Sequence, residues 1–277
     1  MLHWKQLLHL TDEQLTTYDV AEVNLVCAAE LPGAEKIDHI ECIDRLNHYA
    51  HCVHHFTTRR RDGFLAEPAV YNRSESVFRV TCLMTLLWRH FGIRYNPTKR
   101  NGHVAFDTAD TFIHGAVLGS GGTCATLPVV YVAVGRRLDY PLKLVACAKH
   151  LFARWEEAGG ERFNIEINES GTSIHQDDHY RQGRYAVSSE IEKRFCFLRS
   201  LTPRTELAHF LAQRGHLWLD AGRHQEALEA FTWAARLSPA NEGYQSCVKA
   251  AWKHWEKSAR VACGTIRQLK NLRKLLA

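Results

Sequence analysis

A change in hydrophobic period near residue 141 constrains the fold more than any other feature of this sequence. Before it, apolar residues recur at the three- and four-residue steps of helices, as do Val20, Val23 and Cys27. After it, short apolar runs at 142–147, 150–156 and 162–167 predict strands, and Gly159-Gly160 predicts a hairpin between the last two. From Pro203 onward the period is helical again. The order predicts an α+β fold, in which a central helix packs on a short antiparallel sheet and an all-α region follows.

The helical part before residue 141 divides into several segments. Helices are expected at about 37–56, from Ser74, a good N-cap, to Gly92, over a short stretch at 110–117, and from Cys124 to Leu138. An extended connection is expected at 93–107, and the basic triplet at 59–61 predicts a solvated loop.

The composition limits the classes of function. A hydrophobic content of 45% and a charged content of 23% are those of an ordinary globular protein. The net charge of +5 is spread without a long run of one sign, so we expect neither nucleic acid nor a membrane as partner. The amino terminus lacks a signal-peptide pattern, and nine cysteines without a Cys-x-x-Cys spacing indicate reduced thiols. A cytoplasmic protein without cofactor or bound metal is expected.

A glycine-rich loop leads directly into a Thr-Cys pair and then into the helix expected from Cys124. Gly119, Gly121 and Gly122 allow a sharp turn and the close approach of a substrate. A cysteine in the first turn of a helix lies at the positive end of the helix dipole, which favours the thiolate. Free amide groups there can also donate to a developing oxyanion. Cys124 is therefore the candidate nucleophile.

Two of the predicted strands carry partners for this thiol. His150 opens one strand, and Asn164 and Glu166 lie two residues apart on the next, so both point to one face. The hairpin brings that face close to His150, which can take the thiol proton while an acceptor fixes its tautomer. The residues leave open whether Glu166 or Asn164 is that acceptor.

With this order of residues, the segment 122–180 resembles the transglutaminase-like superfamily, and within it the bacterial branch called SirB-like. The resemblance rests on Gly122-Thr123-Cys124, Tyr140-Pro141-Leu142, His150-Leu151-Phe152, Arg154-Trp155 and Phe163-Asn164-Ile165-Glu166. It implies a papain-like fold with a Cys-His-Asp arrangement for amide hydrolysis or acyl transfer through a thioester. Cys124 and His150 match its first two members. Glu166 stands where many relatives have Asp, and Lys149 where relatives often have Gly.

Four other residues near the candidate triad are candidates for oxyanion stabilisation or substrate binding. These are Gly122 and Thr123 beside the thiol, His114 on the preceding helix, and Tyr180 beyond the hairpin. His114 is equally an ordinary half-buried histidine. Tyr180 could anchor the polar segment 175–179, which is interpreted as a loop on the substrate side.

The C-terminal part resembles one tetratricopeptide repeat, as many SirB-like proteins carry. Small and aromatic residues fall at repeat-like steps at positions 211, 215, 218, 222, 227, 231, 234 and 239, with Arg214 where the pattern prefers Leu. A lone repeat cannot bury both faces, so it should pack on the preceding domain or on the helices after it. The expected division is a helical part at 1–118, the transglutaminase-like core at 119–200 and a tetratricopeptide-like region at 201–277.

Two alternatives remain open. His48, His51, Cys52 and His55 lie at helical spacings that could face a zinc ion, although no His-Glu-x-x-His pattern supports a metal and packed side chains explain them better. The chain could also be a catalytically inactive transglutaminase-like module that binds a protein partner through its repeat. As an enzyme, it would act on a protein or peptide.

Overall fold

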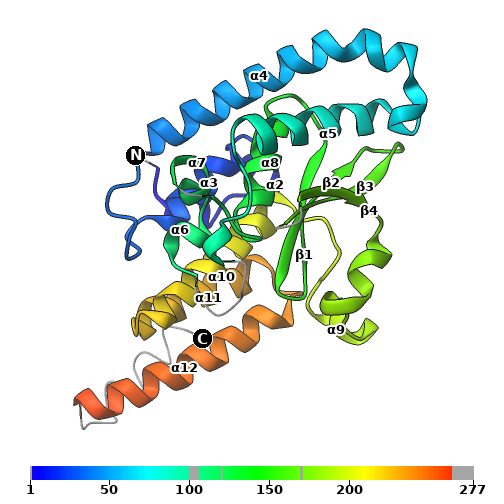
Figure 1. Cartoon of the computed structure of the whole chain (residues 1–277). Helices are drawn as coiled ribbons and strands as arrows, with labels where there is room; N and C mark the ends of the chain where they lie inside the picture. Colours follow the sequence, from blue (N-terminus) through cyan, green and yellow to red (C-terminus); the bar gives the residue numbers. More distant parts are fainter. Residues whose placement is uncertain (1, 100–105, 120, 169–170, 264–277) are drawn as a thin grey trace.

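The structure is a computed structural model that describes residues 2–99, 106–119, 121–168 and 171–263, with the side chains of the last helix described as far as Ser258. Figure 1 shows one long helix across the top, a sheet at one side, and three C-terminal helices beneath. The helices are α1 (Trp4–Leu7), α2 (Asp12–Leu15), α3 (Val20–Ala28), α4 (His39–Ala66), α5 (Glu75–Thr85), α6 (Thr108–Thr111), α7 (Ile113–Leu118), α8 (Leu127–Arg136), α9 (Ser189–Arg194), α10 (Pro203–Asp220), α11 (His224–Leu237) and α12 (Glu242–Cys263).

The sheet confirms the predicted change of period. Its strands are β1 (Leu142–Cys147), β2 (His150–Glu156), β3 (Arg162–Asn168) and β4 (Gly171–His175), and they are antiparallel in the order β1-β2-β3-β4. The first three agree with the sequence to within one residue. β4 was missed, because its residues are mainly polar and half-buried and so lack the alternation that marks a strand. Several helices and one antiparallel sheet make the α+β fold that was expected.

Helix α8 is the centre of the core. Every residue from Leu127 to Gly135 is buried, and the helix contacts α3, α4, α5, α7 and the first three strands. A helix that is apolar on all sides must be surrounded, which explains why the chain wraps helices around it and closes the remaining side with the sheet.

The sheet presents two different faces because side chains alternate along a strand. The face toward α8 carries apolar residues that belong to the main core, including Leu151, Ala153 and Ile165. The opposite face carries His150, Arg154 and a small separate apolar cluster, which contains Phe152 and Tyr180. All the polar side chains expected at the site are therefore on the face that turns away from α8.

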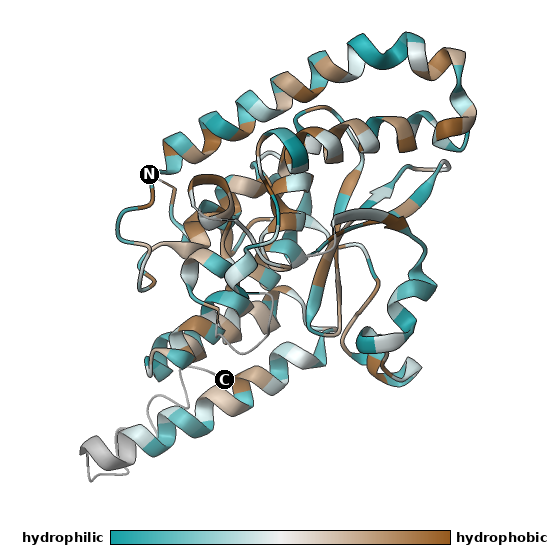
Figure 2. Cartoon of the chain, viewed as in Figure 1, coloured by the Kyte–Doolittle hydropathy of each residue, from teal (hydrophilic) through white to brown (hydrophobic). Residues whose placement is uncertain are grey.

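Helix α4 extends ten residues beyond the predicted end, so the basic triplet at 59–61 is helical and not a loop. Its distal half is held by a second apolar cluster, in which Phe64 stacks on Phe78 with ring centroids 4.8 Å apart. Figure 2 shows hydrophilic and hydrophobic residues alternating along this helix, as in an amphipathic helix lying on a surface. Tertiary packing thus prolongs the helix where the local pattern predicts an end.

The helix that the sequence predicted to begin at Ser74 does begin there. Ser74 caps α5 by accepting a hydrogen bond from the Val77 amide at 3.0 Å. The helix continues through a π-turn at Leu86–His90, and Gly92 ends it in a left-handed conformation with φ +68°. The next connection is extended, and its Tyr95 bridges to Gly122 beside the candidate nucleophile.

The C-terminal helices pack on the rest of the chain as well as on each other. Between α10 and α11, a Cβ on Gly215 would lie 2.7 Å from the Phe231 ring, so glycine is needed for their close approach. Arg214 is buried between Trp4 and Trp218, donates to the Cys27 and Ala29 carbonyls, and pairs with Glu30.

These contacts of Arg214 explain why an arginine stands where leucine was expected, since it satisfies the carbonyls at the end of α3.

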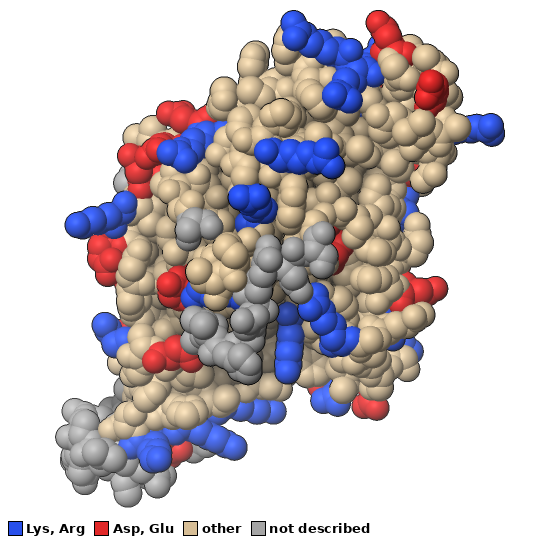
Figure 3. All heavy atoms as spheres, viewed as in Figure 1, with Lys and Arg blue, Asp and Glu red and all other residues tan. Residues whose placement is uncertain are grey.

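The surface bears charges of both signs. Figure 3 shows Lys and Arg side chains over α4 and along α12, with Asp and Glu between these regions. Within the described residues, no helix combines the length and apolarity needed to cross a bilayer.

Candidate active site

The loop before Cys124 needs a glycine at position 122, where its backbone packs closely against other residues. Gly122 pairs with the 94–96 segment, accepting from the Asn96 amide at 2.7 Å and donating to the Arg94 carbonyl at 3.0 Å. A Cβ on Gly122 would lie 2.6 Å from a methyl carbon of Leu127. Gly122 therefore has a structural task, since any side chain would push the loop away from the start of α8.

The sequence predicted a helix that begins at Cys124. In the structure Cys124 lies just ahead of the regular turns of α8. The buried Thr123 begins a helical turn: its carbonyl accepts from Leu127 at 3.0 Å and its hydroxyl from Ala125 at 3.1 Å. Pro128 has no amide hydrogen and cannot donate to the Cys124 carbonyl, so the regular helix starts only at Leu127. Thr123 thus serves as a cap, and Cys124 is the first residue of the capped turn.

The Thr123 side chain is anchored in the core and is not free to bind a substrate. It is fully buried, and its hydroxyl donates to the Asp110 carbonyl at 2.5 Å. Asp110 in turn is held by Lys99, whose Nζ lies 2.6 Å from a carboxylate oxygen. These contacts fix the backbone that presents Cys124, whose own side chain is half-buried.

His150 lies between Cys124 and Glu166. Its Nε2 is 2.9 Å from both carboxylate oxygens of Glu166, and its side chain lines the same two cavities as Cys124, which acts to raise the pKa of His150. Because Nε2 faces the carboxylate, Nδ1 is the nitrogen left for the thiol. His150 and Glu166 are both buried, so water competes little for their hydrogen bonds.

The electrostatics of this pair favour an ion pair. Burial alone would lower the pKa of His150, but the hydrogen bonds and charges of Cys124 and Glu166 outweigh it and raise the pKa to about 9. For Glu166, burial acts to raise the pKa, yet the hydrogen bonds from His150, Tyr180 and Asn168 leave it lowered. At neutral pH the arrangement therefore holds an imidazolium beside a carboxylate.

Aromatic rings hold the histidine and the carboxylate in place. Tyr185 stacks on the His150 ring with centroids 4.7 Å apart. Tyr180, expected to bind substrate or anchor a loop, is buried at 2% exposure and donates its hydroxyl to Glu166 at 2.8 Å. Its ring stacks on Phe152 at 3.8 Å. Tyr180 thus acts on Glu166 from behind, away from any substrate.

Asn164, the alternative acceptor for His150, faces other partners. Its side-chain oxygen accepts from Arg154 at 2.7 Å, and its nitrogen donates to Asp177 at 2.8 Å. Arg154 lies opposite Asn164 in the strand pairing, which places Asn164 too far along the sheet to reach His150. The segment that contains Asp177, interpreted as a substrate-side loop, closes this buried network.

His114 lies apart from Cys124. Its charged neighbours are Asp107 and His39, both of its ring nitrogens are buried without a partner, and burial lowers its pKa to about 4. It lines neither of the cavities at Cys124, so its surroundings give no support to an oxyanion role.

The histidines of α4 do not form a cluster that could hold a metal ion. The Cys52 sulfur lies 3.7 Å from Nε2 of His48, and the His48 ring packs edge-on against Phe91. In the described part of the chain, no three His, Cys, Asp or Glu side chains have the arrangement of a metal site.

Two cavities meet at the Cys124–His150 pair. One, of about 430 Å³, lies between the start of β2 and the helices α10 and α12. The other, of about 290 Å³, is lined by residues that include Tyr95, Asn168 and Tyr185. Cys124, Lys149 and His150 line both, so the candidate nucleophile is accessible from two sides.

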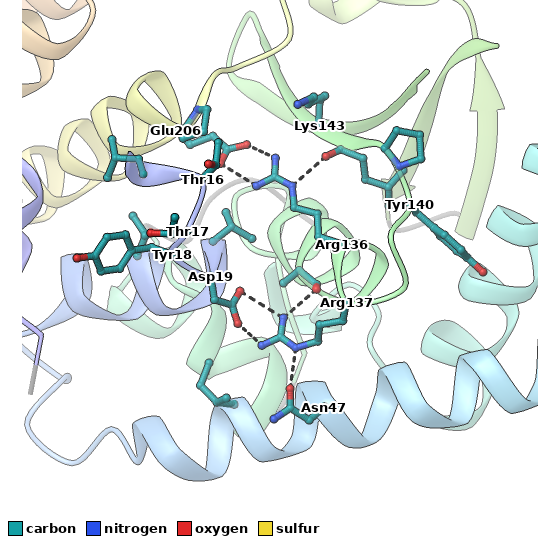
Figure 4. Close-up of a pocket in the computed structure, with 18 residues that line it drawn as sticks. Thr16, Thr17, Tyr18, Asp19, Asn47, Arg136, Arg137, Tyr140, Lys143 and Glu206 are labelled. Carbon is teal, nitrogen blue, oxygen red and sulfur yellow. Dashed lines mark hydrogen bonds and ion pairs between the residues drawn. The ribbon is translucent and has the colours of Figure 1, made fainter. Parts of the chain in front are cut away.

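A larger cavity, of about 660 Å³, lies elsewhere, where α8 ends. Figure 4 shows that its two arginines are already engaged. Arg136 forms two hydrogen bonds with Glu206 at 2.5 and 3.0 Å, and Arg137 pairs with Asp19. These ion pairs tie α8 to α10 and α3, and the cavity holds no thiol. Size alone is therefore a poor guide to the site here.

Sequence reasoning missed three residues of the site. Asn168 donates to Glu166 at 3.4 Å and follows Asn164 and Glu166 at the same two-residue step, so extending the alternation would have found it. Tyr95 and Tyr185 arrive from distant segments, and no local pattern marks them.

A known family matches the part of the chain that carries these residues. The family model described as transglutaminase-like superfamily matches residues 43–212, more than half of the chain, and the matched segment contains Cys124, His150 and Glu166. The chain belongs to the transglutaminase-like superfamily, for which a papain-like thiol fold is expected. No curated protein and no solved structure matches it significantly.

Proposed function

We propose that the chain is a thiol amidase or acyltransferase in which Cys124 is the nucleophile, His150 the acid–base and Glu166 the orienter. The observation that carries this proposal is the placement of His150, with one ring nitrogen on Glu166 and with Cys124 beside it in both cavities. A histidine held between a carboxylate and a thiol is the arrangement that activates a sulfur nucleophile.

The proposed reaction begins with attack of the Cys124 sulfur on an amide carbonyl. Proton donation by His150 lets the C–N bond break, the amine leaves, and a thioester remains on Cys124. Water or a second amine then attacks the thioester, with His150 now accepting its proton. The reaction is hydrolysis if water attacks and acyl transfer if an amine does.

The Cys124 backbone supports the same chemistry. Among the described residues, its amide donates to no protein acceptor, whereas the amides of Thr123, Ala125 and Thr126 are all occupied within the capped turn. A free amide at the start of a helix suits the developing oxyanion. We assign this role to the Cys124 amide. We do not assign it to the other candidates, Gly122, Thr123, Tyr180 and His114.

The finer affiliation also belongs to the proposal. The α10–α11 hairpin, with Gly215 against Phe231, supports a tetratricopeptide-like repeat and thus the SirB-like branch. A peptide or protein substrate in a cytoplasmic setting fits that branch. The repeat would then lie next to the substrate, because α10 and α12 line one of the two cavities at Cys124.

Alkylation tests the nucleophile directly. With iodoacetamide at pH 7, we expect Cys124 to react at least about tenfold faster than the half-exposed Cys196 and Cys247, as read by peptide mass spectrometry. His150→Ala should abolish that advantage, and His175→Ala should leave it unchanged. Equal rates at the three thiols, or a Cys124 rate indifferent to His150, would sink the proposal and favour a catalytically inactive binding module.

A further inference from the structure

The two cavities at Cys124 differ in chemical character. In the 430 Å³ cavity the described lining is largely apolar and includes Leu151, Phe195 and Phe197, with Lys149 at its mouth and no carboxylate or guanidinium. The 290 Å³ cavity carries Lys149 and Arg184 together with the amide of Asn168, and again no carboxylate among the described lining residues. One side of the thiol is thus mainly apolar and the other is basic.

The sheet explains why the two sides differ. Ala146 and Leu151 pair across β1 and β2 and point to the face that packs on α8, which is the apolar side. Asn168 shares the face of Glu166, two residues away, which is the polar side. His150 opens β2 at the edge between them, so the Cys124–His150 pair stands where the two environments meet.

The C-terminal helices complete the apolar cavity. His209, Gln213 and His216 come from α10, and Tyr244 and Cys247 from α12. Burial lowers the pKa of His209 to about 4 and also lowers that of His216, so both rings are neutral at pH 7. The wall contributed by these helices therefore adds hydrogen-bonding groups without charge.

Lys149 stands at the mouth of both cavities in a conformation that favours glycine. It lies in the two-residue turn between β1 and β2 with φ +59°, a left-handed value at which a lysine is disfavoured. Because a lysine and not a glycine stands in this turn, a cation lies at the mouth of both cavities. Attraction of an anion is the task that a lysine can perform there.

We propose that the substrate is an amide with a bulky apolar group on one side of the reacting carbonyl and an anionic group, such as a carboxylate, on the other. The apolar group lies in the 430 Å³ cavity against Leu151, Phe195 and Phe197, and the anion lies near Lys149 in the 290 Å³ cavity. This inference rests on the proposed function, since it takes Cys124 as the reacting group.

Competition with alkylation tests the two-sided substrate. N-phenylacetylglycine and N-benzylsuccinamic acid each carry an aromatic group and a carboxylate on opposite sides of an amide, in the two possible orders. We expect one of them to protect Cys124 from iodoacetamide at a concentration at least about tenfold below that needed with phenylacetamide or acetylglycine, which each offer one half. If neither compound protects better than the halves, the inference is wrong.

Matched variants assign the two groups to the two cavities. Ala146→Leu narrows the apolar cavity and Ala148→Leu the basic one, with the same change two residues apart. The first should slow N-benzyl iodoacetamide more than iodoacetamide, and the second should not. Lys149→Gln should lower the ratio of iodoacetate to iodoacetamide rates at Cys124 by roughly threefold, as expected for one nearby charge. Lys143→Gln, outside both cavities, is the control.

The ratios separate this inference from the proposed function. A change in the thiol itself affects both reagents and cancels in the ratio. Fast, His150-dependent labelling of Cys124 without selectivity among the reagents would overturn the substrate inference alone. Slow labelling of Cys124 by every reagent would overturn the proposed function as well.

Discussion

Nε2 of His150 lies 2.9 Å from each carboxylate oxygen of Glu166, although the two residues are not opposite each other in the pairing of β2 with β3. The pairing aligns Ala153 with Ile165, so His150 and Glu166 are diagonal neighbours on one face. Glutamate has one more methylene than aspartate. That extra length suits a diagonal contact, and the charge interaction it creates governs the first predictions.

Replacing Glu166 should change the ionisation of His150. In Glu166→Gln the counter-charge is lost while the burial remains, so the pKa of His150 should fall from about 9, although Cys124 still acts to raise it. Two-dimensional NMR of labelled histidines, with His150 assigned by its absence in His150→Gln, measures this. Glu156→Gln makes the same change farther along β2 and should leave His150 as it is. An unchanged His150 titration in Glu166→Gln would contradict the geometry.

Stability should depend on pH through the same pair. The pKa of His150 is raised in the folded state, so its contribution to stability is complete below about 6.5 and is lost as the pH rises through about 9. The pKa of Glu166 is lowered, so its contribution is present above about 4.5 and is lost as the pH falls through the lowered value.

The alkaline part of this dependence is the easier to measure. Between pH 6.5 and 9.5 the free energy of unfolding in urea should fall by on the order of 1–2 kcal/mol more for the wild type than for Glu166→Gln, because only the part of the pKa shift that Glu166 causes is lost. Both proteins would be kept reduced, so that their thiols titrate alike. Parallel curves for the two proteins would show that the pair is not coupled to folding.

Tyr180 should act as a positioning residue. Tyr180→Phe keeps the ring stack on Phe152 but removes the hydroxyl that donates to Glu166 at 2.8 Å. We expect a loss of about 1–3 kcal/mol in unfolding free energy, because a buried charged acceptor loses a donor. Iodoacetamide labelling of Cys124 should also slow several-fold.

The second readout separates positioning from plain stability. Tyr71→Phe, in the distant cluster with Phe64 and Phe78, serves as the matched control. Stability loss in Tyr180→Phe with an unchanged labelling rate would reduce Tyr180 to a packing residue.

The close approach of α10 and α11 can be tested with two alanine substitutions. Gly215→Ala would place a Cβ 2.7 Å from the Phe231 ring and should cost about 1–3 kcal/mol of unfolding free energy. Gly63→Ala, in α4 with nothing within 4 Å, should instead gain about 0.5–1 kcal/mol from helix propensity. Urea titration measures the free energy of unfolding of both variants. If both substitutions change it by the same amount in the same direction, the packing argument is wrong.

The sequence predicted the sheet better than the helices. A short run of apolar residues marks a buried strand, and β1, β2 and β3 fall almost where such runs placed them. The end of α4 was misjudged because contacts with a separate cluster around Phe78 extend it. The first turn at Cys124 was misjudged because the missing amide of Pro128 delays the regular helix.

Local sequence was sufficient for the order of the candidate triad. A glycine loop before a cysteine, a histidine that opens a strand, and acceptors on the next strand depend on backbone conformations that neighbouring residues dictate. The family match to residues 43–212 includes these residues.

The choice between Glu166 and Asn164 depended on tertiary structure. Both point to one face, and only the strand register sets Asn164 against Arg154 and leaves Glu166 for His150. The same holds for Tyr180 behind Glu166 and for the wall that α10 adds to the cavity at Cys124. Such contacts join residues far apart in the chain. Their geometry follows from how the whole core packs, and no local period records it.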